Sequence, residues 1–342
     1  MNNNFKKMHK QFIKLLKIHG VSGQEQNVRS YLEKVLPNFM DEVVVDTYGN
    51  LLATKKIGNG KGATVLLSAH MDTVKGVLAD RNVLENNGVI TSSKGALGAD
   101  DRGGIAIILE VLRNVEKLSF EGTLKIAFSR EEEIGCVGAS KIDPKWYEGV
   151  DLAIVVDRRG NRDIVVGCFE AFCSDEVGHF MENCSALQGM DWKCVEGGIS
   201  DATQFSAKGV NSVNLSAGYM NEHTEREFAV FSDMCDTVRL ILQVFGVIND
   251  HCHKFGEVPY ENQWVELGYS SKPVKQYSKY YSESYYEDVF SNDYAYAEEF
   301  DSNGDVYVYE VGKNMVIQQG ETEILLSRST LKSIVNQLKK VL

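Results

Sequence analysis

Four strand-length segments constrain the fold of this chain more than any other feature of its sequence. They are "ATVLLSAH" (63–70), "GTLKIAFS" (122–129), "DLAIVVD" (151–157) and "VNSVNLS" (210–216), and segments with helical spacing of apolar residues lie between them. The first is apolar at successive positions, which is typical of a strand covered on both faces in a parallel sheet. The alternation of strands and helices predicts an α/β layered domain with a mostly parallel central sheet.

Shorter signals predict the remaining elements of the main domain. Residues 5–36 are expected to form two helices around "GVSGQE", where Ser22 would cap the second helix with Glu25 three residues later. Hairpins are predicted over 41–56 and over 82–92, the latter with Asn87-Gly88 at its turn. Amphipathic helices are predicted over 101–115 and 228–248.

The sequence changes character after about residue 255. Residues 261–310 contain 11 acidic and 3 basic residues, so this window carries −8 of the net charge of −12, and ten of the fifteen tyrosines lie within 269–309. Too little aliphatic surface is available there to offset the entropy of ordering the chain. We therefore predict a catalytic domain over 1–255, an acidic tyrosine-rich linker over 256–304 and a small C-terminal α+β module over 305–342.

Composition excludes several classes of protein. The acidic net charge argues against a nucleic-acid partner, and no run of 18 apolar residues is present, which argues against a membrane span. The N-terminus reads as an amphipathic helix and lacks the apolar core of a signal peptide. Seven scattered cysteines without a CxxC motif favour reduced thiols and a cytoplasmic protein.

Acidic and histidine side chains form five clusters, each located just after a predicted strand or just before a predicted helix. His70 and Asp72 end the first strand two residues apart, so they point to the same face. The other positions are "GADDRGG" with Asp100 and Asp101, "REEEIG" with Glu131 to Glu133, "VVDRRG" with Asp157, and "NEHTERE" with His223. Ligands bind at the carboxyl edge of an open α/β sheet, where strand ends of this kind meet.

Each cluster has an ordinary explanation when taken alone. A strand-terminal aspartate commonly caps a turn or helix, an acidic run is usually solvated, and a single histidine in a loop is commonly a surface residue. Gathered at one edge, however, the carboxylates would raise one another's pKa values unless cations neutralised them. Divalent metals bound by imidazole and carboxylate groups would do so.

The order and spacing of the five motifs resemble the di-zinc exopeptidase clan that includes peptidase T, the glutamate-carboxypeptidase-type enzymes and the zinc aminopeptidases. The resemblance covers residues 5–247 and implies a three-layer, phosphorylase/hydrolase-like α/β sandwich. It also implies two divalent metal ions, with zinc expected and cobalt or manganese as alternatives. One metal would be held by His70, Asp100 and Asp157, and the other by Asp100, Glu133 and His223.

The resemblance further implies roles for two carboxylates that do not bind metal. Glu132 would be the general base that takes a proton from the metal-activated water. Asp72 would orient His70 through its second ring nitrogen. The clan has one residue between its acidic pair and the following glycine, so Gly135 selects Glu132 and Glu133 and leaves Glu131 as a surface residue.

The chain departs from part of the clan in one respect. Peptidase T and its carboxypeptidase relatives insert a lid or dimerisation domain after the aspartate that matches Asp157, whereas only residues 158–196 separate Asp157 from "GGISDATQFSAKG" here. The lid normally supplies groups that stabilise the oxyanion. His179, Tyr219 and Arg226 are the open candidates for that role, and Ser200 and Asp201 are expected either to contact substrate or to cap a helix.

These observations together predict an aminopeptidase-like exopeptidase that hydrolyses a terminal peptide bond in short peptides. An N-acyl amino-acid deacylase is the alternative within the same chemistry, and a catalytically silent peptide-binding protein is the alternative outside it. The expected partners are a short peptide substrate and, for assembly, further copies of the chain.

Overall fold

The computed structural model describes residues 5–168, 170–259, 306–311, 314–319 and 322–327. The chain divides into two units, residues 1–275 and residues 276–342. The described part of the second unit is a three-stranded antiparallel sheet, β14 (Val306–Val311), β15 (Asn314–Gln319) and β16 (Thr322–Ser327). The final helix expected there and the tyrosine-rich linker, apart from its first four residues, lie outside the described residues.

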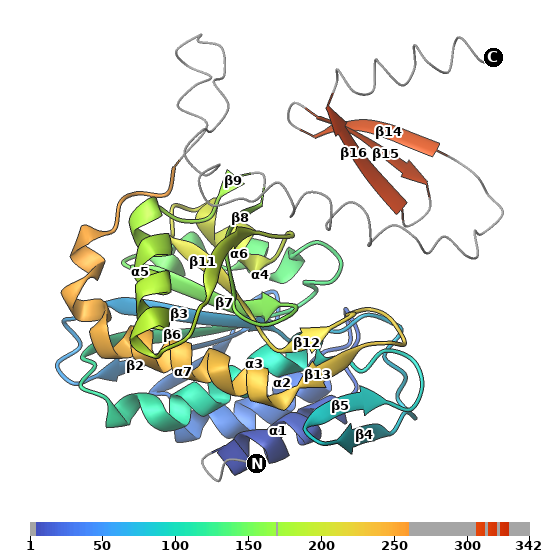
Figure 1. The fold of residues 1–342 in the computed structure, drawn as a ribbon, viewed down its shortest axis with the longest axis horizontal. Coiled ribbons are helices and arrows are strands. Elements are labelled where there is room, and N and C mark those ends of the chain that lie inside the picture. Colours follow the sequence, from blue (N-terminus) through green and yellow to red (C-terminus); the bar gives the residue numbers. More distant parts are fainter. Residues whose placement is uncertain (1–4, 169, 260–305, 312–313, 320–321, 328–342) are drawn as a thin grey trace. The chain divides into compact units, whose positions relative to one another are not determined.

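A nine-stranded sheet forms the framework of the first unit (Figure 1). Its order is β1 (Glu42–Val45), β2 (Leu51–Ile57), β6 (Gly122–Ser129), β3 (Thr64–His70), β7 (Leu152–Arg158), β11 (Ser212–Ser216), β8 (Asp163–Cys168) and β10 (Lys193–Glu196), with β9 (Glu170–Ala171) paired to β8. The central strands β6, β3, β7 and β11 run parallel. This confirms the predicted fold class.

Helices cover both faces of this sheet. On one face, α3 (Ala99–Asn114) packs on β3 and β7 and contacts both α1 (Lys6–Leu16) and α7 (Phe231–Val247), while α5 (Asp175–Leu187) packs beside α7. On the other face, α4 (Val137–Lys141) and α6 (Asp201–Ser206) contact each other and the sheet. Val65, Leu66 and Leu67 of β3 are fully buried as a result, which explains the apolar run.

The first unit also contains a separate four-stranded antiparallel sheet, whose strands come from two distant parts of the chain. It contains β4 (Val83–Asn86), β5 (Val89–Ser92), β12 (Tyr219–Met220) and β13 (Phe228–Val230). Asn87 and Gly88 both have positive φ at the β4–β5 turn, as the Asn-Gly signal predicts. Helix α2 (Gln26–Val35) and the short 3₁₀ turns η2 (Leu36–Asn38), η3 (Val115–Lys117), η4 (Pro144–Tyr147), η5 (Ile248–Asp250) and η6 (Cys252–Lys254) complete the described helices.

Two expectations about local structure meet different outcomes. After β7, the described residues up to 200 contain β8, β9 and β10, which belong to the large sheet, and α5, which packs beside α7, so no separate domain follows Asp157 in this part of the chain. The predicted cap of the second helix is wrong, because α2 begins at Gln26 with Glu25 as its N-cap. The Ser22 hydroxyl instead donates to Asp72 Oδ2 at 2.8 Å, since burial beside the sheet edge gives it a stronger acceptor.

Among the described residues, none of the helices combines the length and the apolar character needed to cross a membrane. All seven cysteines lie in the described residues, and none of them forms a disulfide bond.

Candidate metal centre

The sequence-predicted site residues converge at the carboxyl edge of the parallel strands. His70 is the last residue of β3, Glu132 and Glu133 follow β6, and Asp157 lies near the end of β7. His223 lies in the loop between β12 and β13. Because β3, β6 and β7 are parallel neighbours, their carboxyl ends bring these residues together.

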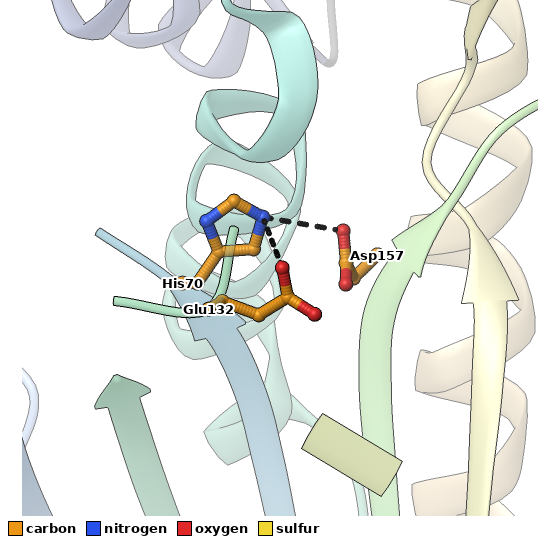
Figure 2. Close-up of side chains that lie close together, drawn as sticks. All are labelled: His70, Glu132 and Asp157. Carbon is orange, nitrogen blue, oxygen red and sulfur yellow. Dashed lines mark ion pairs between the residues drawn. The ribbon is translucent and has the colours of Figure 1, made fainter. Parts of the chain in front are cut away.

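His70 points one ring nitrogen at a group of carboxylates (Figure 2). Its Nε2 lies 3.0 Å from Asp100 Oδ1, 3.4 Å from Asp157 Oδ1 and 3.9 Å from Glu132 Oε2. The side chain of His70 is only 1% exposed. A buried imidazole facing three carboxylates is the arrangement expected around a bound cation.

Asp100 lies between the two histidines. Its Oδ1 faces His70, and its Oδ2 lies 3.0 Å from Nε2 of His223, which is also 2.7 Å from Glu133 Oε2. The two oxygens of one carboxylate therefore serve two neighbouring donor sets. The Asp100–Asp101 peptide bond is cis.

Asp72 supports the turn that carries the acidic pair. Its Oδ1 accepts a hydrogen bond from the backbone of Glu132 at 3.0 Å, and its Oδ2 accepts one from the backbone of Glu133 at 3.2 Å. Asp72 Oδ1 also lies 3.3 Å from Nδ1 of His70. One buried carboxylate thus fixes both the imidazole and the Glu132–Glu133 backbone.

The buried carboxylates and histidines of the cluster strongly shift one another's pKa values. Burial raises the pKa of Asp157 to about 7 against the opposing effect of His70. Burial and then the charge of Asp157 raise the pKa of Glu132 well above its ordinary value. Burial acts to lower the pKa of His223, but hydrogen bonds with Asp100 and Glu133 raise it to about 11. The cluster therefore favours any species that adds positive charge.

The donor set fits a divalent metal. Oε1 of Glu133 is buried and accepts no hydrogen bond from any residue that the structure describes. His70, Asp100 and Glu133 each offer a ligand atom, and these atoms lie within 4.8 Å of one another. The same holds for His70, Glu132 and Asp157. Imidazole nitrogen with carboxylate oxygen is a common zinc environment.

Sequence reasoning missed the group that anchors Asp100. Glu227 is 2% exposed, and its carboxylate accepts hydrogen bonds from the backbone N–H groups of Gly98 at 2.8 Å, Ala99 at 2.6 Å and Asp100 at 3.1 Å. Burial raises the pKa of Glu227 to about 7 against these bonds. A glutamate in a polar loop gives no signal of such a role, because the partners are 127 to 129 residues away.

Other buried polar groups around the centre were also missed or underestimated. Arg102 is 1% exposed and donates to the carbonyl oxygens of Met71 at 2.7 Å and Gly20 at 3.3 Å. The side chain of Asn214 exchanges two hydrogen bonds with the backbone of Asp157. These contacts hold the strand ends that carry the site.

The structure also shows where the candidates for oxyanion stabilisation, substrate contact and helix capping lie. Tyr219 is buried and donates to Asp157 Oδ1 at 2.9 Å, whereas His179 on α5 and Arg226 are exposed. Ser200 accepts a hydrogen bond from Ala202 as the N-cap of α6. Glu131, expected to be a surface residue, is half-buried, since its side chain is 17% exposed and contacts Tyr48 and Arg130.

Comparisons with known proteins agree with this arrangement. The family model of the M42 glutamyl aminopeptidases matches residues 76–240, slightly less than half of the chain. Peptidase T of Clostridium botulinum is 30% identical over 154 residues, which are 42% of this chain and 37% of that protein. The chain thus spans well under half of this curated relative.

Solved structures share the fold at low sequence identity. The aminopeptidase PepT from Bacillus cereus has a TM-score of 0.64 and 17% identity, covering 70% of this chain and 98% of that one. The TET1 peptidase of Pyrococcus horikoshii has a TM-score of 0.57 and 19% identity, covering 69% and 98%. The family model and peptidase T are thus similar to parts of this chain, and the solved structures show a shared fold.

Proposed function

We propose that this protein is a metal-dependent exopeptidase that removes residues from the amino terminus of short peptides. The observation that carries the proposal is the position of Asp100, whose two oxygens each face a histidine at 3.0 Å, with Glu132 beside the same cluster. The name of the matched family and the PepT fold support amino-terminal hydrolysis.

Two divalent ions would be held by these side chains. His70, Asp100 and Asp157 would hold one, and Asp100, Glu133 and His223 the other, with zinc best suited to the donors and cobalt or manganese as alternatives. When bound, such ions lower the pKa of water and polarise a peptide carbonyl. Asp72 would keep the imidazole of His70 oriented through Nδ1.

Glu132 is positioned to move the proton. Its carboxylate reaches the cluster through Oε2, and burial raises its pKa, which favours proton uptake relative to an exposed glutamate. It would take a proton from the attacking water and deliver it to the leaving amine. Its backbone is fixed by Asp72, so the carboxylate needs little reorganisation.

The test replaces Glu132 with glutamine and its neighbour Glu131 with glutamine as the matched control. Glu132→Gln removes the base but preserves size, so kcat should fall by roughly 10²-fold or more. Glu131→Gln should retain most of the activity. Both variants should bind about two metal ions per chain, measured by elemental analysis. Undiminished turnover by Glu132→Gln would contradict the assignment.

A substrate panel separates the proposal from its two rivals. Peptides with a free amino terminus should be hydrolysed, whereas N-blocked peptides should not. Preferential cleavage of N-acyl amino acids would identify a deacylase. Binding of peptides without turnover of any panel member, in protein shown to carry metal, would identify a silent binding protein.

We further propose that the protein acts in the cytoplasm and assembles into a homo-oligomer. The P. horikoshii TET1 peptidase assembles into a tetrahedron or an octahedral shell, which supports self-association in a shared fold. Light scattering coupled to size-exclusion chromatography should give a mass that is a multiple of 38.2 kDa.

A further inference from the structure

Glu132 also belongs to a second cluster of three side chains, together with Cys136 and Asp201. Glu132 Oε2 faces His70 at 3.9 Å, whereas Glu132 Oε1 lies 3.2 Å from the Sγ of Cys136. Cys136, Glu132 and Asp201 each offer a ligand atom, and these atoms lie within 4.8 Å of one another. Neither Cys136 nor Asp201 is used by the two ion sites proposed above.

A tight backbone turn holds the thiol in this position. The N–H groups of Gly135 and Cys136 both donate to the carbonyl oxygen of Glu132 at 2.8 Å. Cys136 has a φ of 54° and precedes α4 as its N-cap. The turn therefore folds the thiol back over the carboxylate of Glu132, and Cys136 is only 1% exposed.

Asp201 supplies an independent indication of a missing partner. It is 1% exposed, and its Oδ2 accepts a hydrogen bond from Ser129. Its Oδ1 is buried and accepts none from any residue within the described part of the chain. A buried carboxylate oxygen without a donor is costly, because the group has lost its hydration and gained nothing in return.

We propose that Cys136, Asp201 and Glu132 form a third cation site, selective for a thiophilic divalent ion such as Zn²⁺, Cd²⁺ or Co²⁺. One sulfur and two carboxylate oxygens suit such ions better than Mg²⁺ or Ca²⁺, which prefer oxygen ligands alone. On binding, the metal–sulfur bond forms as the thiol releases its proton to solvent, and no electron transfer is involved.

The site would make hydrolysis sensitive to excess metal. An ion bound there would occupy Glu132 Oε1 and reduce the ability of this carboxylate to accept a proton. Inhibition rests on the proposed role of Glu132, whereas binding of the third ion does not. The two claims can therefore fail separately.

Cobalt titration of the full-length protein tests the binding claim. Co²⁺ bound to a thiolate gives a near-ultraviolet charge-transfer band that nitrogen and oxygen ligands do not give. The wild-type protein should show this band as a third equivalent of Co²⁺ binds. Cys136→Ser should bind two equivalents without the band. The matched control Cys252→Ser, which removes a partly exposed thiol elsewhere, should keep both the band and the third equivalent.

A second variant covers the case in which Cys136→Ser does not fold. Asp201→Asn keeps the thiol and the side-chain size, so the band should persist but require at least tenfold more Co²⁺. Excess Co²⁺ should slow the wild-type enzyme, and Cys136→Ser should need at least tenfold more to lose the same fraction of its own activity. A band retained in Cys136→Ser, or absent from the wild-type protein at three equivalents, would overturn the proposal. Failure of the peptidase assignment would appear instead as no turnover of any peptide by metal-loaded wild-type protein, and failure of the proposed role of Glu132 as undiminished turnover by Glu132→Gln.

Discussion

At the scale of single residues, the centre depends on side chains that serve two partners at once. Asp100 faces both histidines, and Asp72 joins His70 to the backbone of Glu132 and Glu133. If such a side chain moves, its contacts with both partners change. Residues that position Asp100 should therefore matter nearly as much as the proposed ligands.

Glu227 provides the clearest test of this dependence. Glu227→Gln would put an amide N–H₂ against the backbone donor of Gly98, because the carboxylate now accepts from three N–H groups. We expect metal affinity to fall about tenfold or more. Stability should fall by roughly 1–3 kcal/mol. Competition with a chelator measures the affinity, and Glu225→Gln, in the same loop but exposed, should behave as wild type. Unchanged affinity in Glu227→Gln would contradict the role.

At the scale of elements, α4 packs closely against the end of β6, just before the acidic pair. Asn50 links the two elements, since its Oδ1 accepts from the backbone of Arg130 at 3.0 Å and its Nδ2 donates to Gly138 O at 2.9 Å. Gly138 lies in this contact, and its N–H donates to Arg130 O at 2.9 Å.

Gly138→Ala should disrupt this contact. A Cβ there would lie 2.2 Å from Arg130 O and 2.5 Å from Asn50 Oδ1, so the backbone before Glu132 must move. We expect a loss of roughly 1–3 kcal/mol in the free energy of unfolding and reduced activity. Gly246→Ala in α7, where a Cβ meets nothing within 4 Å, should be neutral or slightly stabilising. Denaturant titration compares the two, and equal stability would refute the packing argument.

A hydrogen bond at the amino-terminal ends of β3 and β7, away from the metal centre, makes the stability of the fold depend on pH. Asp151 precedes β7, and its Oδ2 accepts a hydrogen bond from the backbone of Thr64 at 2.7 Å. Burial raises the pKa of Asp151 despite that bond. The folded state therefore binds its proton more tightly than the unfolded state, and the contribution of Asp151 to stability falls as pH rises through the folded pKa.

Asp151→Asn removes this titration but keeps an acceptor for Thr64. The stability of the variant relative to wild type should therefore increase as the pH rises from about 4, the ordinary pKa of aspartate, through the raised pKa of Asp151 in the folded state. Thermal unfolding of both proteins across this range measures the difference. A difference that stays constant with pH, or that decreases, would exclude the assigned shift.

At the scale of the whole molecule, every proposed site residue lies in the first unit. Residues 1–275 contain the nine-stranded sheet and both helical layers, whereas the described part of residues 276–342 is a separate three-stranded sheet. The first unit buries an extensive apolar core on both faces of its sheet. Its folding should not require the second unit.

Deletion of residues 276–342 should leave the metal centre functional. We expect about two bound metal ions per chain and a kcat/KM within about twofold of the full-length value, because the ligands and their anchors all lie in the retained unit. Elemental analysis and steady-state kinetics provide the measurements. Loss of metal from a truncated protein that remains folded by circular dichroism would show that the second unit supports the site.

The sequence by itself determined the fold class and the parts of the chain that meet. Continuous apolar strands specify a sheet covered on both faces, and strand periodicity places His70 and Asp72 on one side. Through a resemblance to a known clan, the spacing within "EEEIG" predicts that Glu132 and Glu133, and not Glu131, serve the site. These are local or repeating patterns, which one sequence is able to display.

Only the tertiary structure decided how the individual atoms pair. It directed Ser22 to Asp72 instead of to a helix, buried Arg102, brought Glu227 to the turn of Asp100, and left Asp201 Oδ1 without a donor within the described residues. Each outcome depends on groups far apart in the chain and on the loss of water around them. A buried polar side chain needs a hydrogen-bond partner, because it has lost its contact with water. Which group serves as that partner depends on the folded structure.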